Sequence, residues 1–172
     1  MECKRYDGVY KDYDGFKRNI LFDSVCVDSS RGNSLYLFPY NAAIIKRKAE
    51  KSKTKYSRGS IYGMRQNGKL ARFFQHGMLY SSGFFIIMEI GDLIIYSQES
   101  VSIFGLRTDE YYYSANLNSK IRLLRKRNLK KDFSSNPDFI KNLESLKNLL
   151  DKSSDGKYKI VRVYSNSLKT KT

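Results

Sequence analysis

Basic side chains gather in two segments of this 172-residue chain, and binding a polyanion is the chemistry that they could perform. Residues 46–58 carry seven basic residues and one acid, and residues 120–131 carry seven basic residues and no acid. Because each phosphate neutralised by Lys or Arg releases a counterion, such concentrated positive charge attracts nucleic acids and other polyanions. The candidate polyanion-binding residues are Lys46, Arg47, Lys48, Lys51, Lys53, Lys55 and Arg58 in the first basic segment and Lys120, Arg122, Arg125, Lys126, Arg127, Lys130 and Lys131 in the second.

The two basic segments hold most of the formal net charge of +15, so the rest of the chain is nearly neutral. A solvated lysine-rich surface explains the same charge equally well, and no nucleic-acid-binding motif of the RRM, KH, zinc-finger or helix-turn-helix type accompanies it. Tyr56, Tyr62 and residues 111–113 could stack on unpaired bases. The competing interpretation is that these tyrosines are strand residues, with one face of Tyr112 in the core.

Catalytic chemistry has little support in the residue pattern. His76 is the only histidine, and it could act as the general base of a nuclease near Arg65 and Arg72, or be a loop residue before Gly77. The chain has no nucleophile elbow, no phosphate-binding loop and no dinucleotide-binding glycine motif. We therefore expect a non-enzymatic binding or structural module without cofactor or metal, with a His76-dependent nuclease as the exception.

Cys3 and Cys26 are the only cysteines. With a single histidine they are too few to complete a tetrahedral zinc site. They could form a disulfide in an exported protein. We favour the alternative, in which Cys3 is an exposed thiol and Cys26 a small buried hydrophobe.

The elements that must position the basic segments are mostly strands. Hydrophobic residues make up 41% of the chain and aromatics 14%, which excludes a disordered polyelectrolyte. Asn67-Gly68 predicts a tight hairpin turn, and the two Asp-Gly pairs at 7–8 and 14–15 predict further turns. The first basic segment reads as a mobile loop because Lys, Ser and Thr dominate it. The expected strands are 20–27, 34–38, 61–65, 69–74, 84–90, 93–96, 101–106 and 110–114.

The hydrophobic period changes near the end of the chain. Asn136-Pro137 predicts a helix start, and apolar residues at 139, 143, 146 and 150 form one helical stripe. A last strand is expected near residues 158–163. The fold class is therefore α+β: mainly an antiparallel β-sheet or partial barrel with one C-terminal helix packed on it. We expect one domain over 1–172, with its core at about 16–164 and a flexible tail at 165–172.

Three stretches carry recognisable motifs: Ser60–Lys69 has a Tyr-Gly-x-Arg hairpin motif, Tyr111–Phe133 is a tyrosine-rich block that ends in Asn-Leu-Lys-Lys-x-Phe, and Tyr158–Ile160 follows it. These stretches resemble the corresponding hairpin, block and continuation of a group of uncharacterised Bacteroidetes proteins. The chain departs from the pattern by being more basic at Arg125–Arg127 and by carrying Asn116 where Asp is common. The resemblance implies export and no particular catalytic residue.

Compartment and partner stay open at this point. The longest apolar run is five residues, too short for a membrane-spanning helix, and the first residues lack the apolar stretch of a signal peptide. The protein is thus expected in the cell envelope or periplasm if a leader has been removed, and otherwise in the cytoplasm. Its partner is expected to be a macromolecule or polyanion, nucleic acid included, and the oligomeric state is left open.

Overall fold

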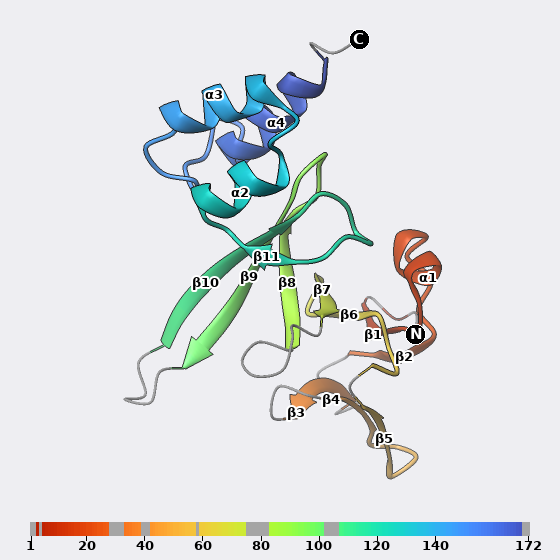
Figure 1. The fold of residues 1–172 in the computed structure, drawn as a ribbon. Coiled ribbons are helices and arrows are strands. Elements are labelled where there is room, and N and C mark those ends of the chain that lie inside the picture. Colours follow the sequence, from red (N-terminus) through yellow and green to blue (C-terminus); the bar gives the residue numbers. More distant parts are fainter. Residues whose placement is uncertain are drawn as a thin grey trace. The chain divides into compact units, whose positions relative to one another are not determined.

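The computed structural model describes residues 3, 5–27, 33–38, 42–57, 59–74, 83–101 and 107–169, and over these residues the chain has an α+β fold. One antiparallel sheet has eight strands in the order β11-β10-β9-β8-β7-β6-β1-β2, and a second has three in the order β3-β4-β5 (Figure 1). The predicted fold class and antiparallel sheet are confirmed. The strands are β1 (Tyr6–Tyr10), β2 (Asp23–Cys26), β3 (Ser34–Phe38), β4 (Ala42–Arg47), β5 (Ser52–Ser57), β6 (Gly63–Gln66), β7 (Lys69–Phe74), β8 (Gly83–Glu89), β9 (Ile94–Val101), β10 (Arg107–Ser114) and β11 (Arg122–Leu123). The helices are α1 (Tyr13–Lys17), α2 (Lys126–Asp132), α3 (Pro137–Ser145) and α4 (Lys159–Lys169).

The chain divides into two compact units, Met1–Ile86 and Ile87–Thr172, which are called unit 1 and unit 2 below. Each has a hydrophobic core of its own. The first basic segment belongs to unit 1 and the second to unit 2. The division into units does not decide whether the chain is one domain, so the expectation of a single domain stays a prediction.

Unit 1 buries apolar side chains from both of its sheets in one core. Val9, Val25 and Met64 contribute from one sheet, and Ala43 and Ile45 contribute from the other. Side chains alternate between the two faces of a strand, so residues 43 and 45 of β4 face this core together. Arg47 lies on the same face as these two residues, whereas Lys46 lies on the opposite one.

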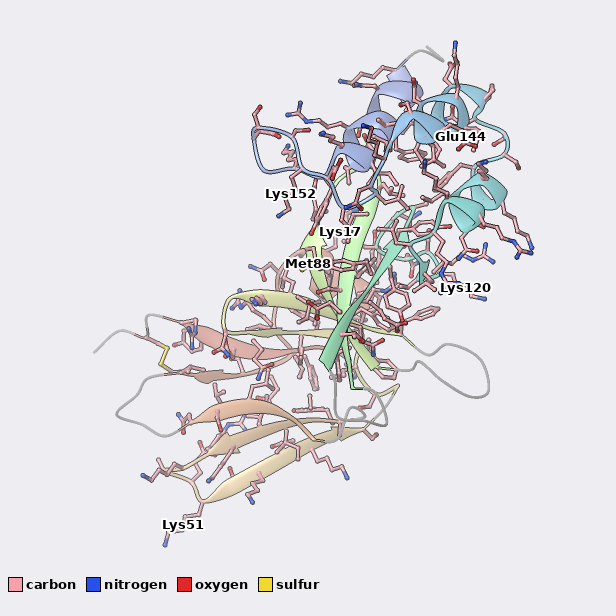
Figure 2. All side chains as sticks on the ribbon, turned by 90° about the vertical axis from the view of Figure 1, so that its left-hand side faces the viewer. Lys17, Lys51, Met88, Lys120, Glu144 and Lys152 are labelled. Atoms are coloured by element: carbon pink, nitrogen blue, oxygen red, sulfur yellow. A yellow bond between two sulfur atoms is a disulfide. The ribbon has the colours of Figure 1, made fainter. Side chains whose placement is uncertain are left out.

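The cysteines form a disulfide, so the expectation of free thiols is wrong. Cys3 and Cys26 are joined, with their Cα atoms 5.8 Å apart (Figure 2, yellow bond). The β1–β2 ladder explains the pairing, because it places Tyr6 opposite Cys26 and is continued by a hydrogen bond from the Val27 amide to the Arg5 carbonyl at 3.0 Å. The chain just before β1 is thereby held beside the end of β2.

The turn predictions in unit 1 are confirmed at one site and wrong at two. Asn67 and Gly68 have φ of 51° and 75°, the conformation that a tight hairpin between β6 and β7 requires. Gly8 instead lies within β1, where a Cβ atom would meet the Asp23 carbonyl oxygen at 2.3 Å, so glycine is needed for close strand approach rather than for a turn. Gly15 lies within α1, a short helix whose first turn is capped by the Asp12 side chain at 2.8 Å from the Gly15 nitrogen.

The interpretation of residues 46–58 as a mobile loop is wrong. Residues 42–47 and 52–57 are β4 and β5, which pair along their whole length, and the chain reverses between Lys48 and Lys51, the latter with φ of 50°. The side chains of β5 alternate between half-buried and exposed, which a count of lysines does not reveal. Arg58 and His76 lie outside the described residues.

Unit 2 packs helices α2, α3 and α4 on one end of the β9–β10 pair (Figure 1). Its core joins strand residues such as Ile95 and Tyr113 to helix residues such as Leu129, Phe139 and Ile160. The predicted start of α3 is confirmed: Pro137 is its first residue, and the Asn136 side chain accepts a hydrogen bond from the Phe139 amide at 3.2 Å.

Several boundaries differ from prediction. The helix ends at Ser145, so the apolar stripe does not continue to Leu150, and residues 159–169 form helix α4 instead of a strand and a tail from 165. The buried side chains at 160, 161 and 167 are compatible with helical spacing. The few residues from 158 to 163 alone are too short to distinguish this spacing from the alternation of a strand. The strand predicted at 20–27 is confined to Asp23–Cys26, and residues 102–106 of another predicted strand lie outside the described residues.

In the part of the chain that the structure describes, no helix combines the length and apolar character needed to cross a membrane.

Candidate polyanion-binding surfaces

The first basic segment presents a row of lysines on one face of the β4–β5 hairpin. Lys46 lies directly opposite Lys53, and Lys55 lies two residues further along β5 on the same face. All three side chains are exposed. We call these three residues the lysine face.

Two more lysines extend the lysine face at the hairpin turn. Lys48 and Lys51 are exposed, and Figure 2 shows Lys51 at the tip of the hairpin with its side chain directed outward. Glu50 is the acid of this turn, and its carboxylate accepts a hydrogen bond from the Ser52 hydroxyl at 3.2 Å. Lys46, Lys48, Lys51 and Lys53 form no ion pair with any residue that the structure describes.

The Lys46–Lys53 pair destabilises the hairpin when no ligand is bound. Side chains directly opposite each other in an antiparallel pair have Cβ atoms about 4.5–5.5 Å apart, and like charges there are destabilising. An anion bound between the two ammonium groups would remove that repulsion.

Arg47 does not belong to this surface. Its guanidinium forms an ion pair with Asp23 and donates to the Thr54 hydroxyl at 3.2 Å, and its side chain is only 20% exposed. The Tyr56 hydroxyl donates to the same Asp23 carboxylate. Burial, followed by this hydrogen bond and the negative charge of Asp23, raises the pKa of Tyr56 to about 12. Arg47 and Tyr56 therefore tie the hairpin to β2, and neither is available to a ligand.

The second basic segment is partly neutralised by acids from its own unit. Arg122 forms an ion pair with Asp132, and Lys130 forms one with Glu144. The Lys130 hydrogen bond holds the pKa of Glu144 below its usual value. Lys126 donates to the Glu144 carbonyl at 3.2 Å. The second basic segment, residues 120–131, contains neither acid, because Asp132 lies just beyond it and Glu144 is on the next helix.

The remaining cations of the second basic segment are exposed. Lys120 lies in the loop before β11 (Figure 2), Arg125 precedes α2, and Arg127 and Lys131 are one helical turn apart on α2. None of the four forms an ion pair with a residue in the described part of the chain. They come from a loop and a short helix, so no strand register fixes their spacing. Because the two basic segments lie in separate units, each surface is described by itself.

The tyrosines proposed for base stacking differ in burial. Tyr112 and Tyr113 are 4% and 1% exposed, and the Tyr113 hydroxyl donates to Asp132 at 2.6 Å. Burial, reinforced by that hydrogen bond, raises the Tyr113 pKa well above its ordinary value. Tyr62 packs edge-on against Phe16 with ring centroids 5.2 Å apart. The base-stacking interpretation is therefore wrong for Tyr112 and Tyr113, and the expectation that Tyr112 has a face in the core is confirmed. For Tyr62 and Tyr111, which are half-buried, it stays a prediction.

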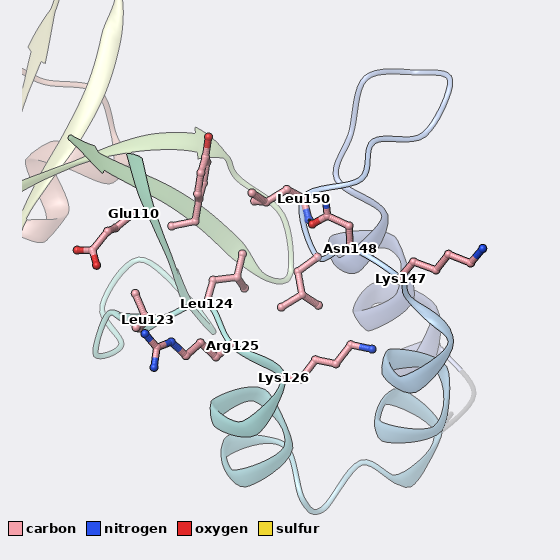
Figure 3. Close-up of a pocket in the computed structure, with 10 residues that line it drawn as sticks. Glu110, Leu123, Leu124, Arg125, Lys126, Lys147, Asn148 and Leu150 are labelled. Atoms are coloured by element: carbon pink, nitrogen blue, oxygen red, sulfur yellow. The ribbon is translucent and has the colours of Figure 1, made fainter. Parts of the chain in front are cut away.

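Sequence reasoning missed a cavity of about 470 Å³ in unit 2, whose lining includes Arg125 and Lys126, two cations of the second basic segment (Figure 3). No pattern of motifs signals it, because its walls come from β10, β11, the start of α2 and the chain after α3. The lining residues are Glu110, Tyr111, Leu123, Leu124, Arg125, Lys126, Lys147, Asn148, Leu149 and Leu150. Among the described residues, no cluster of three or more His, Cys, Asp or Glu side chains is arranged to hold a metal ion.

Comparison with known proteins adds no relative from which a function could be transferred. No protein-family model, no curated protein and no solved structure matches the chain.

Proposed function

We propose that this protein is a non-enzymatic binding module that holds an extended polyanion on the lysine face of its β4–β5 hairpin. The observation that carries the proposal is the direct opposition of Lys46 and Lys53, with Lys55 on the same face and two more lysines at the turn. Phosphate or sulfate groups along a polymer would lie between these ammonium groups, and recognition would depend on charge rather than on base sequence.

Protection of a sheet edge is the competing explanation for lysines in a hairpin. Lysines on an edge strand prevent pairing with another chain, and β5 is one of the two edge strands of its sheet. That explanation covers Lys53 and Lys55. It does not cover Lys46, which lies on the central strand β4 between Ser34 and Lys53.

The proposal includes an exported protein of the cell envelope or periplasm. The Cys3–Cys26 disulfide supports it, because disulfides persist mainly in oxidising compartments. The resemblance to exported Bacteroidetes proteins points the same way. Polyanions of such a compartment, sulfated or phosphorylated glycans for example, are then better candidates than nucleic acid. Cell fractionation combined with thiol labelling tests this part: cytoplasmic protein with two reactive thiols would contradict it.

Equilibrium binding at several salt concentrations tests the polyanion proposal. Heparin represents sulfated glycans, and a duplex DNA oligonucleotide represents phosphate polymers. If Lys46, Lys48, Lys51 and Lys53 each neutralise one phosphate, log K for the duplex should fall with log salt with a slope of about −3.6. A slope near zero, or no binding of either polymer at low salt, would contradict the proposal.

Charge reversal locates the site. The variant Lys46→Glu/Lys53→Glu should weaken heparin binding about tenfold or more, because it reverses the centre of the lysine face. The matched control is Lys141→Glu/Lys157→Glu, which reverses two exposed lysines of unit 2 that belong to neither basic segment. Equal weakening by both variants would show that net charge alone governs binding, and the proposed site would be abandoned.

A further inference from the structure

We propose that the cavity of about 470 Å³ in unit 2 is a binding site for a small amphipathic anion, a carboxylate on a hydrocarbon chain. This inference is independent of the lysine face. The volume of the cavity falls within the usual range of about 300–1,000 Å³ for ligand pockets.

The cavity wall is largely apolar. Leu124, Leu149 and Leu150 are half-buried and pack on the core of unit 2, and Leu123 and Tyr111 complete the apolar lining. Figure 3 shows Leu124 and Leu150 on the two sides of the space, one before α2 and the other in the chain after α3. A hydrocarbon chain buried against such a wall is removed from water, which favours binding.

The polar part of the lining favours an anion over a neutral ligand. Arg125, Lys126 and Lys147 line the cavity, against one carboxylate, that of Glu110. Glu110 already accepts a hydrogen bond from the Tyr112 hydroxyl at 2.8 Å. Arg125 and Lys147 are exposed and form no ion pair with any residue in the described ranges, so both can reach an anionic head group. The guanidinium of Arg125 can hold a carboxylate through two parallel hydrogen bonds.

The surrounding backbone is fixed by hydrogen bonds. The Leu124 amide donates to the Tyr111 carbonyl at 2.8 Å, and the Leu123 carbonyl accepts from the Asn128 side chain at 2.9 Å. The Leu150 amide donates to the Asn148 side chain at 3.0 Å, which holds the chain after α3 in a turn. A pre-formed site of this kind loses little conformational entropy when a ligand binds.

Titration of the full-length protein with decanoate, below the concentration at which it forms micelles, tests the inference. We expect saturable binding of one decanoate, with amide chemical-shift changes concentrated at residues 110–111, 123–126 and 147–150. Decanol and acetate, which lack the charge and the chain respectively, should each bind at least about fivefold more weakly. Decanol binding as tightly as decanoate, or shifts spread over the whole chain, would overturn the inference.

Two exposed positions on or next to α2 provide the matched variants. Arg125→Glu should weaken decanoate binding about three- to tenfold, because it reverses a charge at the cavity. Lys131→Glu makes the same change in net charge away from the cavity lining and should leave binding within twofold of wild type. Lys46→Glu/Lys53→Glu should also leave decanoate binding unchanged while weakening heparin binding, which separates this site from the lysine face. Equal affinities for Arg125→Glu and wild type would exclude the site.

Discussion

The two basic segments have nearly the same charge density but very different organisation. In unit 1, Lys46, Lys53 and Lys55 project from one face of a hairpin whose other face is tied down by Arg47. In unit 2, Asp132 and Glu144 neutralise part of the charge, and the remaining cations lie on a loop and a short helix. Cationic composition is therefore a poor guide to a binding surface, because register and local acids decide which charges are available.

The largest expected effect on stability comes from the disulfide of β2, the strand to which Arg47 and Tyr56 tie the β4–β5 hairpin. The Cys3–Cys26 disulfide closes a loop with a sequence separation of 23 residues. Constraining the unfolded chain in this way contributes about 3 kcal/mol. The Cys3→Ser/Cys26→Ser variant should lose about that much free energy of unfolding, measured by urea titration. Hydrogen exchange should show the loss first at amides of β1 and β2. A variant as stable as the oxidised wild type would contradict this role.

In unit 2 the corresponding test concerns the acid that pairs with the second basic segment. Asp132 accepts hydrogen bonds from both Tyr113 and Arg122. Asp132→Asn should cost about 1–2 kcal/mol, because it removes a charge-assisted pair beside a buried tyrosine. Because Arg122 belongs to unit 2, heparin binding on the lysine face of unit 1 should stay within about twofold of wild type.

The control for Asp132 is Glu144→Gln. The side chains of the Lys130–Glu144 pair are 43% and 52% exposed, and exposed ion pairs contribute little, so the variant should have nearly the free energy of unfolding of the wild type. Equal losses from the two variants would show that Asp132 has no special role.

Parts of the fold that depend on local chemistry were predictable from the sequence, and parts that depend on other contacts were not. The Asn67-Gly68 hairpin and the capped start of α3 were predictable, because turn and cap chemistry is local. The end of α3 was not, because the apolar stripe continues past it: Leu146 has extended backbone, and Leu149 and Leu150 line the cavity instead of continuing the helix.

The candidate site likewise has parts that the sequence predicts and parts that it does not. The lysines of the first basic segment were found by composition alone, but the separation of Lys46 from Arg47 onto opposite faces requires the strand register. The disulfide and the cavity depend on contacts between distant residues, which no local pattern records.

The pH dependence of unit 1 tests how the hairpin is anchored. Because burial and the Asp23 hydrogen bond raise the pKa of Tyr56 to about 12, the folded state holds this proton more tightly than the unfolded state, where the pKa is about 10. The resulting stabilisation is complete below pH 10 and is lost as the pH rises from about 10 to 12.

Tyr56→Phe isolates this contribution from that of the other buried tyrosines. It should cost about 1 kcal/mol at neutral pH through the lost hydrogen bond. Urea titrations at several pH values should show the difference from wild type shrinking between pH 10 and 12. A difference that is constant over this range would mean that Tyr56 is not anchored by Asp23.

The smallest expected effect concerns the lysine face itself, and it has the opposite sign. Lys53→Thr removes the repulsion with Lys46 and places a good strand former on β5, so it should stabilise the protein by a few tenths of a kcal/mol to about 1 kcal/mol. Lys55→Thr is the matched control, because it makes the same substitution on the same strand opposite Ile44 instead of a lysine. Greater stabilisation by Lys53→Thr, together with weaker heparin binding, would mean that unit 1 sacrifices stability for a charged surface. Equal stabilisation by the two variants would mean that Lys46 and Lys53 do not repel each other measurably, and the hairpin would then differ from the second basic segment in geometry alone.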